Sequence, residues 1–111
     1  MVTEIVFIGR DNAIDLQLQD DSQTPGTLNN TDLSAATKVE VVINDGNSYD
    51  STANPTVVMF NPVTGVVTLK LGTMFTAENV YDAQIVVYDA VNTNGVLWNP
   101  KFSLDVKADS F

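Results

Sequence analysis

Apolar and polar residues alternate with a period of two along most of the chain. The clearest runs are AIDLQLQ, KVEVVI, GVVTLKL, VYDAQIVVYD and KFSLDV. This period is typical of half-buried β-strands, because successive side chains of a strand point to opposite faces of the sheet. With the shorter apolar runs at residues 4–8 and 56–60, the sequence predicts seven strands.

The alternation also predicts which side chains of the five clear runs face the core. Polar side chains between them, such as Asp15, Glu40 and Thr68, are expected on the outer faces of the sheets. The core side is expected to carry Ile14, Leu16, Leu18, Val39, Val41, Ile43, Val67, Leu69, Leu71, Tyr81, Ala83, Ile85, Val87, Phe102, Leu104 and Val106.

Turn residues separate the predicted strands. NDGN at residues 44–47 and NTNG at residues 92–95 contain the Asn, Asp and Gly that tight hairpins need, and NPVTG and TPG are further turn signals. Seven short strands with frequent turns predict an antiparallel β-sandwich or barrel, folded as one domain over residues 1–111. Residues 73–79 are expected to make a helical turn, and residues 20–32 an ordered surface loop.

Two residues in the last predicted hairpin indicate specific features of the fold. Pro100 has no backbone N–H to donate, so its strand is expected at a sheet edge or with a bulge. Tyr81 stands two residues before Ala83, which is the spacing of the tyrosine corner in immunoglobulin domains. We therefore interpret Tyr81 as a structural residue rather than a binding residue.

The first predicted strand, at residues 4–8, is apolar on both faces. Ile5 and Phe7 are expected to face the core, which leaves Val6 and Ile8 on the other side. An apolar outer face on a terminal strand predicts coverage by a neighbouring element or another subunit. The run is too short to span a membrane and lacks the basic flank of a signal peptide, so a soluble protein is expected.

Composition restricts the chemistry that the chain can perform. Its 111 residues include no cysteine and no histidine, and 14 acidic against 5 basic residues give a net charge of −9. Disulfides and zinc sites built on Cys and His are therefore excluded, and a nucleophilic serine would lack its usual base. The negative charge argues against nucleic-acid binding. A hydrolase would need two carboxylates converging on a cleft, but the acidic residues fall mostly on predicted outer strand faces or in turns. We therefore expect a non-enzymatic protein without a cofactor.

Two alternative binding functions arise from aromatic and acidic residues. Tyr49, Tyr88 and Trp98 are candidates for an exposed aromatic platform that would bind carbohydrate, with Tyr88 expected to point outward. A core position is the simpler interpretation of the single tryptophan. Oxygen ligands for calcium would come from the densest acidic region, although solvated turn carboxylates are the simpler interpretation: Asp11, Asn12, Asp15, Asp20 and Asp21.

Four segments combine strand and turn residues in one order along the chain: DLSAAT at residues 32–37, GVVTLKL at 65–71, YDAQIVVYD at 81–89 and PKFSLDV at 100–106. Together they resemble the immunoglobulin-like N-terminal domain of tailed-phage baseplate upper proteins and similar small virion domains. Ala35 stands where that pattern has a glycine. The resemblance covers roughly residues 11–107 and implies an immunoglobulin-like β-sandwich of about seven strands.

The resemblance also implies a function without catalytic residues, namely attachment of one virion protein to another. Because the sequence ends at Phe111 without a receptor-binding or coiled-coil region, we expect a tail- or baseplate-associated accessory protein or a head decoration. Such a protein is made in the host cytoplasm, enters the virion, and either forms a homo-oligomer or docks on an oligomeric partner. The candidate interface residues are Val6, Ile8, Tyr88 and Trp98.

Overall fold

The computed structural model describes residues 2–20 and 29–108, which are almost entirely strands and turns. The all-β class that the alternation predicts is confirmed, with β6 and the short strands β3 and β4 in addition to the seven expected. The elements are β1 (Val2–Phe7), β2 (Ile14–Gln17), β3 (Gln19–Asp20), β4 (Asn29–Asn30), β5 (Ala36–Ile43), β6 (Ser48–Asp50), β7 (Val58–Phe60), β8 (Val66–Leu69), η1 (Gly72–Met74), β9 (Asn79–Asp89) and β10 (Val96–Lys107).

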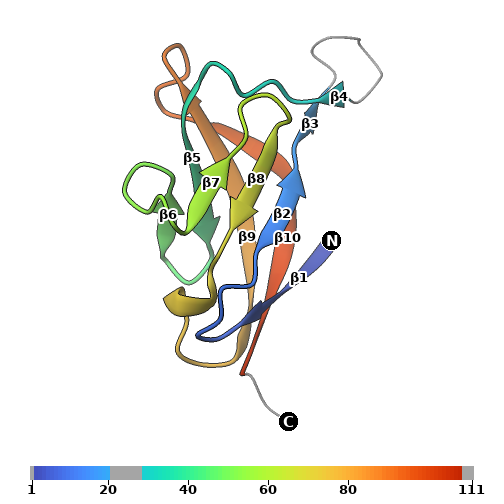
Figure 1. Ribbon diagram of the computed structural model, residues 1–111, viewed down its shortest axis with the longest axis vertical. Helices are drawn as coiled ribbons and strands as arrows, with labels where there is room; N and C mark the ends of the chain where they lie inside the picture. Colours follow the sequence, from blue (N-terminus) through green and yellow to red (C-terminus); the bar gives the residue numbers. More distant parts are fainter. Residues whose placement is uncertain (1, 21–28, 109–111) are drawn as a thin grey trace.

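The strands form two packed layers, with the smaller sheet in front in Figure 1. The larger sheet has the order β1-β10-β9-β5-β6, the smaller has the order β2-β8-β7, and β3 and β4 form a separate pair. With β2 as strand B and β10 as strand G, these orders reproduce the G-F-C-C′ and B-E-D arrangements of a variable-type immunoglobulin domain. The predicted immunoglobulin-like sandwich is therefore confirmed.

β1 departs from the antiparallel arrangement that the sequence predicts. It pairs in parallel with β10, from Val2 opposite Phe102 to Phe7 opposite Lys107. The larger sheet is therefore mixed. β1 lies beside β10, and no described strand lies on the outer side of β2, which is consequently an edge strand of the smaller sheet.

The core lies between the two sheets and is formed by the alternating apolar residues. Val39 and Val41 of β5, Val67 and Leu69 of β8, and Leu104 of β10 are fully buried. Leu16 and Tyr81 are partly buried and pack against this core. The core faces predicted for β2, β5, β8, β9 and β10 are therefore confirmed.

β1 presents the opposite face to the one predicted. Val6 is only 3% exposed and belongs to the core, whereas Ile5 is 45% exposed. Ile8 packs against the core, and its backbone N–H donates to the Lys107 carbonyl at 2.9 Å. The predicted outer face of Val6 and Ile8 is thus wrong, because the pairing with β10 places Val6 beside the buried Val106.

The hairpin between β9 and β10 has the predicted turn. The Gly95 N–H donates to the Asn92 carbonyl at 3.1 Å, and Gly95 has a positive φ of 84°. The Asp89 carboxylate accepts hydrogen bonds from the backbone N–H groups of Asn92 at 2.6 Å and Val91 at 2.9 Å. These bonds, those from Asn92 first, lower the pKa of Asp89 below its ordinary value.

The strand around Pro100 carries the predicted irregularity. The register of β10 against β9 shifts between Trp98 and Phe102, which brackets the proline. β1 begins opposite Phe102, so the half of β10 before the shift has no strand of the described chain on that side. The bulge and the edge position, which the proline predicts as alternatives, are therefore both found.

Smaller features of the fold match their predictions in part. η1 supplies the expected helical turn, and the described residues contain no helix with the length and hydropathy needed to cross a membrane. The Tyr81 ring stacks on Phe75 with centroids 5.1 Å apart, and Ala83 is buried, which fits a packing role for Tyr81. The loop predicted at residues 20–32 falls mostly on residues 21–28, outside the described residues, while β3 and β4 pair at its ends.

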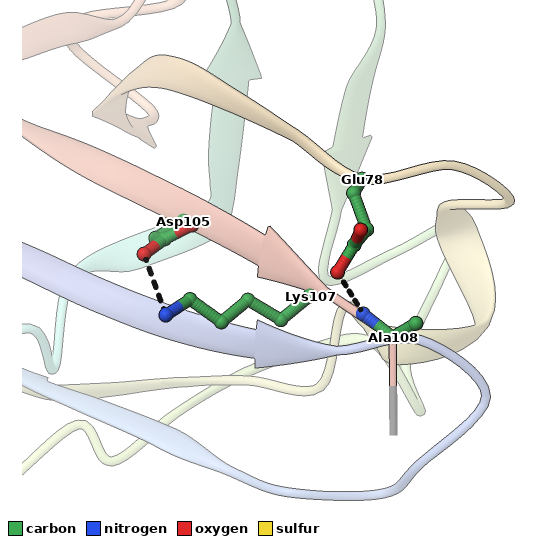
Figure 2. Close-up of polar contacts among 4 residues, drawn as sticks. All are labelled: Glu78, Asp105, Lys107 and Ala108. Atoms are coloured by element: carbon green, nitrogen blue, oxygen red, sulfur yellow. Dashed lines mark hydrogen bonds and ion pairs between the residues drawn. The ribbon is translucent and has the colours of Figure 1, made fainter. Parts of the chain in front are cut away.

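The end of β10 is held by polar contacts that Figure 2 shows. The Glu78 carboxylate accepts a hydrogen bond from the Ala108 N–H at 2.9 Å, and the Lys107 ammonium lies 3.5 Å from an Asp105 carboxylate oxygen. The Lys107 side chain is 51% exposed, so this ion pair contributes little to stability. The bond from Ala108 links the end of β10 to the segment that precedes β9.

Candidate interface at the open edge of the sandwich

A groove of about 450 Å³ lies between the two sheets where β2 forms an edge. It opens here because β1 joins β10 instead of extending the smaller sheet beside β2. Glu4, Asp15 and Lys101 are its charged lining residues. Its apolar lining comes from four strands far apart in the sequence, and consists of Val2, Leu16, Leu18, Ile85, Trp98 and Phe102.

Half of the backbone groups of β2 have no strand partner among the described residues along this groove. The Leu18 N–H donates to the Gly65 carbonyl at 3.1 Å, continuing the antiparallel ladder between β2 and β8. Hydrogen-bonded pairs alternate in such a ladder, so Leu16 also directs its backbone groups toward β8. The backbone groups of Asp15 and Gln17 consequently point to the open edge. The groove is thus bordered by a strand edge that another strand can extend.

Trp98 is the sequence-predicted interface residue that lines this groove. It lies opposite Ile85 on β9 and packs against the core from β10. Its indole Nε1 is buried and has no hydrogen-bond partner among the described residues. Buried donors are nearly always paired in folded proteins, so this N–H marks a place where an additional acceptor would be favourable.

Tyr88, also predicted as an interface residue, lies on the other side of the larger sheet. Its hydroxyl donates a hydrogen bond to the Glu40 carboxylate at 2.8 Å, and the Lys38 ammonium lies 4.3 Å from its ring centroid. The residue borders a shallow pocket of about 460 Å³ together with polar side chains of β5, β6 and neighbouring turns. Tyr88 is therefore already engaged by two charged neighbours.

The hydrogen bond to Glu40 is the largest cause that raises the pKa of Tyr88 above the ordinary phenol value, followed by burial and the charges of Glu40 and Asp50. We expect alkaline titration followed by phenolate absorbance to show a late-ionising phenol that Tyr88→Phe removes. Since the folded-state pKa is the higher one, stability from this bond is present below the ordinary phenol pKa and lost as pH rises through the raised value.

Glu40→Gln is the matched control for this titration, because it keeps the shape of the acceptor and removes its charge. The phenol of Tyr88 is then expected to ionise at lower pH than in the unsubstituted protein. An identical titration curve for Glu40→Gln and the unsubstituted protein would contradict the role assigned to Glu40.

The three aromatic residues considered for carbohydrate binding do not share a surface. Tyr49 lies opposite the buried Val41 and packs against the core, as Trp98 does from β10. Tyr88 lies opposite Lys38, on the outer face, where the Lys38 ammonium stands over its ring. The geometry therefore brings no two of these rings together as a sugar-binding platform.

The acidic residues considered for calcium are equally dispersed where they are described. Asp15 accepts a hydrogen bond from the Thr68 hydroxyl at 2.7 Å, and Asp11 is exposed. Asp21 and the side chain of Asp20 lie outside the described residues. Within residues 2–20 and 29–108, no three Asp, Glu, His or Cys side chains are placed to hold a metal ion.

No protein-family model matches this chain, and no curated protein matches it in sequence. The class of protein comes from the structure, which is an all-β sandwich with the sheet orders of a variable-type immunoglobulin domain. The resemblance to phage virion domains stays a prediction made from strand and turn residues. Fold alone does not specify function, so the function has to be argued from the groove.

Proposed function

We propose that this chain is a non-enzymatic accessory protein of a tailed phage or prophage particle that acts by attachment to other proteins. It is associated with the tail or baseplate or decorates the head. Homo-oligomers or an oligomeric partner supply the symmetry of the assembly. The resemblance of four segments, at residues 32–37, 65–71, 81–89 and 100–106, to virion domains supports the placement in a particle.

The chemistry of the chain supports a role without catalysis. It has no histidine and no cysteine, so general-base and thiol chemistry of the usual kind have no residue to perform them. The groove contains two carboxylates, Glu4 and Asp15, on separate strands, and Asp15 is exposed.

The observation that carries the proposal is the apolar groove beside the open edge of β2. Val2, at its mouth, is 60% exposed although it belongs to a strand of the larger sheet. Exposed apolar surface next to an unpaired strand edge promotes unwanted pairing, and proteins usually cover such edges. A protein that keeps one open is suited to attachment.

Quantitative mass spectrometry of purified particles from the phage or lysogen that encodes the chain tests this function. We expect the chain at a fixed copy number relative to the tail or capsid proteins, retained through density-gradient purification. Absence from purified particles, together with a monomer by light scattering at high concentration, would refute the proposal. A carbohydrate array run in parallel checks the alternative function, for which the dispersed aromatic rings give no expectation of binding.

A further inference from the structure

The open edge of β2 can accept one more strand into the smaller sheet. In the described chain β1 pairs with β10, and no described strand lies beside β2 on its outer side. The smaller sheet consequently ends at β2. An extended chain running along β2 would complete the sheet by the same backbone pairing that other strand-addition complexes use.

The register of β2 determines which residues such a strand would contact. Its backbone would pair with Asp15 and Gln17, whose N–H and C=O groups point to the open edge. Residues directly opposite each other in a sheet share a face, so the residue opposite Leu16 would point into the groove toward Val2 and Trp98. The residues on either side of it would point to solvent.

The charges around the groove specify the polar residues of the incoming strand. Glu4 and Asp15 contribute two carboxylates against the single ammonium of Lys101, in a chain whose net charge is −9. Asp15 lies on the outer face of β2, where it would stand beside an outward-pointing residue of the added strand. A lysine or arginine at that position is favoured by charge complementarity.

A second copy of this chain fits the site poorly. Two β2 edges brought together would place Asp15 of one copy near the acidic residues of the other, and both copies carry the same net charge of −9. Like charges across a paired edge are destabilising. The partner is therefore expected to be a different protein.

We infer that the open edge of β2 binds an extended segment of a partner protein in which apolar residues alternate with lysine or arginine. This inference rests on the proposed attachment function and adds the chemistry of the partner. The segment adds a fourth strand to the smaller sheet, fills the groove with its apolar side chains, and presents its basic side chains to Asp15. Because β2 offers only four residues, Ile14–Gln17, repeated copies in an assembly would supply avidity.

A synthetic peptide of alternating valine and lysine tests the inference, with a peptide of alternating valine and glutamate as its counterpart. Trp98 is the only tryptophan and lines the groove, so its emission reports binding. We expect the lysine peptide, at up to millimolar concentration, to change this emission saturably. It should also slow hydrogen exchange at the backbone amides of Asp15 and Gln17, while the glutamate peptide does neither.

Val2→Lys and Val80→Lys form a matched pair that separates specific binding from general charge attraction. Val2 is 60% exposed in the groove, and Val80 is 61% exposed opposite Asp105 on the outer face of the larger sheet. Both exposed positions tolerate a lysine, and both variants gain one positive charge. We expect Val2→Lys to weaken peptide binding on the order of tenfold or more and Val80→Lys to change it little.

Several results would overturn the inference. These are no response to the lysine peptide, equal responses to both peptides, equal weakening by Val2→Lys and Val80→Lys, or concentration-dependent protection of the β2 edge without peptide, which would indicate a second copy. Attachment to particles is measured separately by mass spectrometry. If the chain is present in particles but the lysine peptide fails to bind, the strand partner is refuted while the proposed function stands.

Discussion

Replacing Leu104 by alanine should lower the free energy of unfolding by about 2–5 kcal/mol. Leu104 is fully buried in β10, between the β1 and β9 neighbours that pair with this strand. The substitution removes apolar contacts and leaves a cavity that the tightly packed sheets cannot fill by relaxation. Denaturant unfolding followed by Trp98 emission measures the loss, and it should appear as a lower midpoint with an unchanged slope.

Leu97→Ala is the matched control for Leu104→Ala. It makes the same change in the same strand, but Leu97 is 56% exposed. A change within about 0.5 kcal/mol is expected there. Equal losses of unfolding free energy for the two variants would contradict the burial of the Leu104 side chain between the sheets.

Replacing Gly65 by alanine should destabilise the protein by about 3 kcal/mol, because two penalties add. Gly65 has φ of +74°, which alanine adopts only with strain. In addition, an added Cβ would come closer than 3.0 Å to the carbonyl oxygen of Thr31, a backbone atom that cannot move aside alone. Gly65 also accepts the hydrogen bond from Leu18, so the disturbance should reach the end of β2. Denaturant unfolding measures this loss as well.

Comparison with Gly9→Ala isolates the steric part of this effect. Gly9 has nearly the same φ, +75°, but nothing lies within 4 Å of the position of an added Cβ. It should therefore cost only the backbone strain, roughly 1 kcal/mol. If Gly65→Ala is no more destabilising than Gly9→Ala, the close approach of Gly65 to Thr31 is not a real constraint.

The sequence predicts most of this fold because its strands alternate cleanly. In β5, Val39, Val41 and Ile43 are buried, whereas the alternate positions Lys38 and Glu40 are not, as their order along the chain indicates. One face of each such strand is far more apolar than the other, so register and orientation follow directly from the pattern.

β1 is the strand whose orientation the pattern does not specify. Both of its faces are apolar, with Ile5 and Phe7 on one and Val6 and Ile8 on the other. The structure resolves this, because Glu4 lies at the open groove while its neighbour on the same face, Val6, is covered by the core. A parallel pairing with β10, about a hundred residues away, decided the orientation.

β6 went unpredicted for a related reason. Ser48–Asp50 contains one apolar residue, Tyr49, and is too short to show a period. It becomes a strand because the turn at residues 44–47 returns the chain onto β5, where Glu40 lies opposite Asp50. Tertiary pairing rather than local pattern makes this segment extended.

The groove could be predicted only in fragments. The sequence marks Trp98 as a candidate and predicts an irregularity near Pro100, but Val2 and Glu4 join Trp98 only after β1 has paired with β10, and Leu18 joins it only when the two sheets pack together. Nothing local marks Val2, Glu4 and Leu18 as neighbours of Trp98, since they lie far from it in the sequence. The first strand, which is apolar on both faces, indicates an unusual sheet edge, although the face predicted for the core is the wrong one.

Site-directed labelling tests the central claim, attachment through the open edge of β2, most directly. Because the chain contains no cysteine, Asp15→Cys and Val80→Cys each create a single thiol, one on the edge strand and one on the outer face of the larger sheet. The measurement is the rate of maleimide labelling in the free protein and in the purified particle. Assembly should slow labelling at Asp15→Cys at least tenfold and leave Val80→Cys nearly unchanged. Equal rates at Asp15→Cys in the free and assembled states would contradict the account.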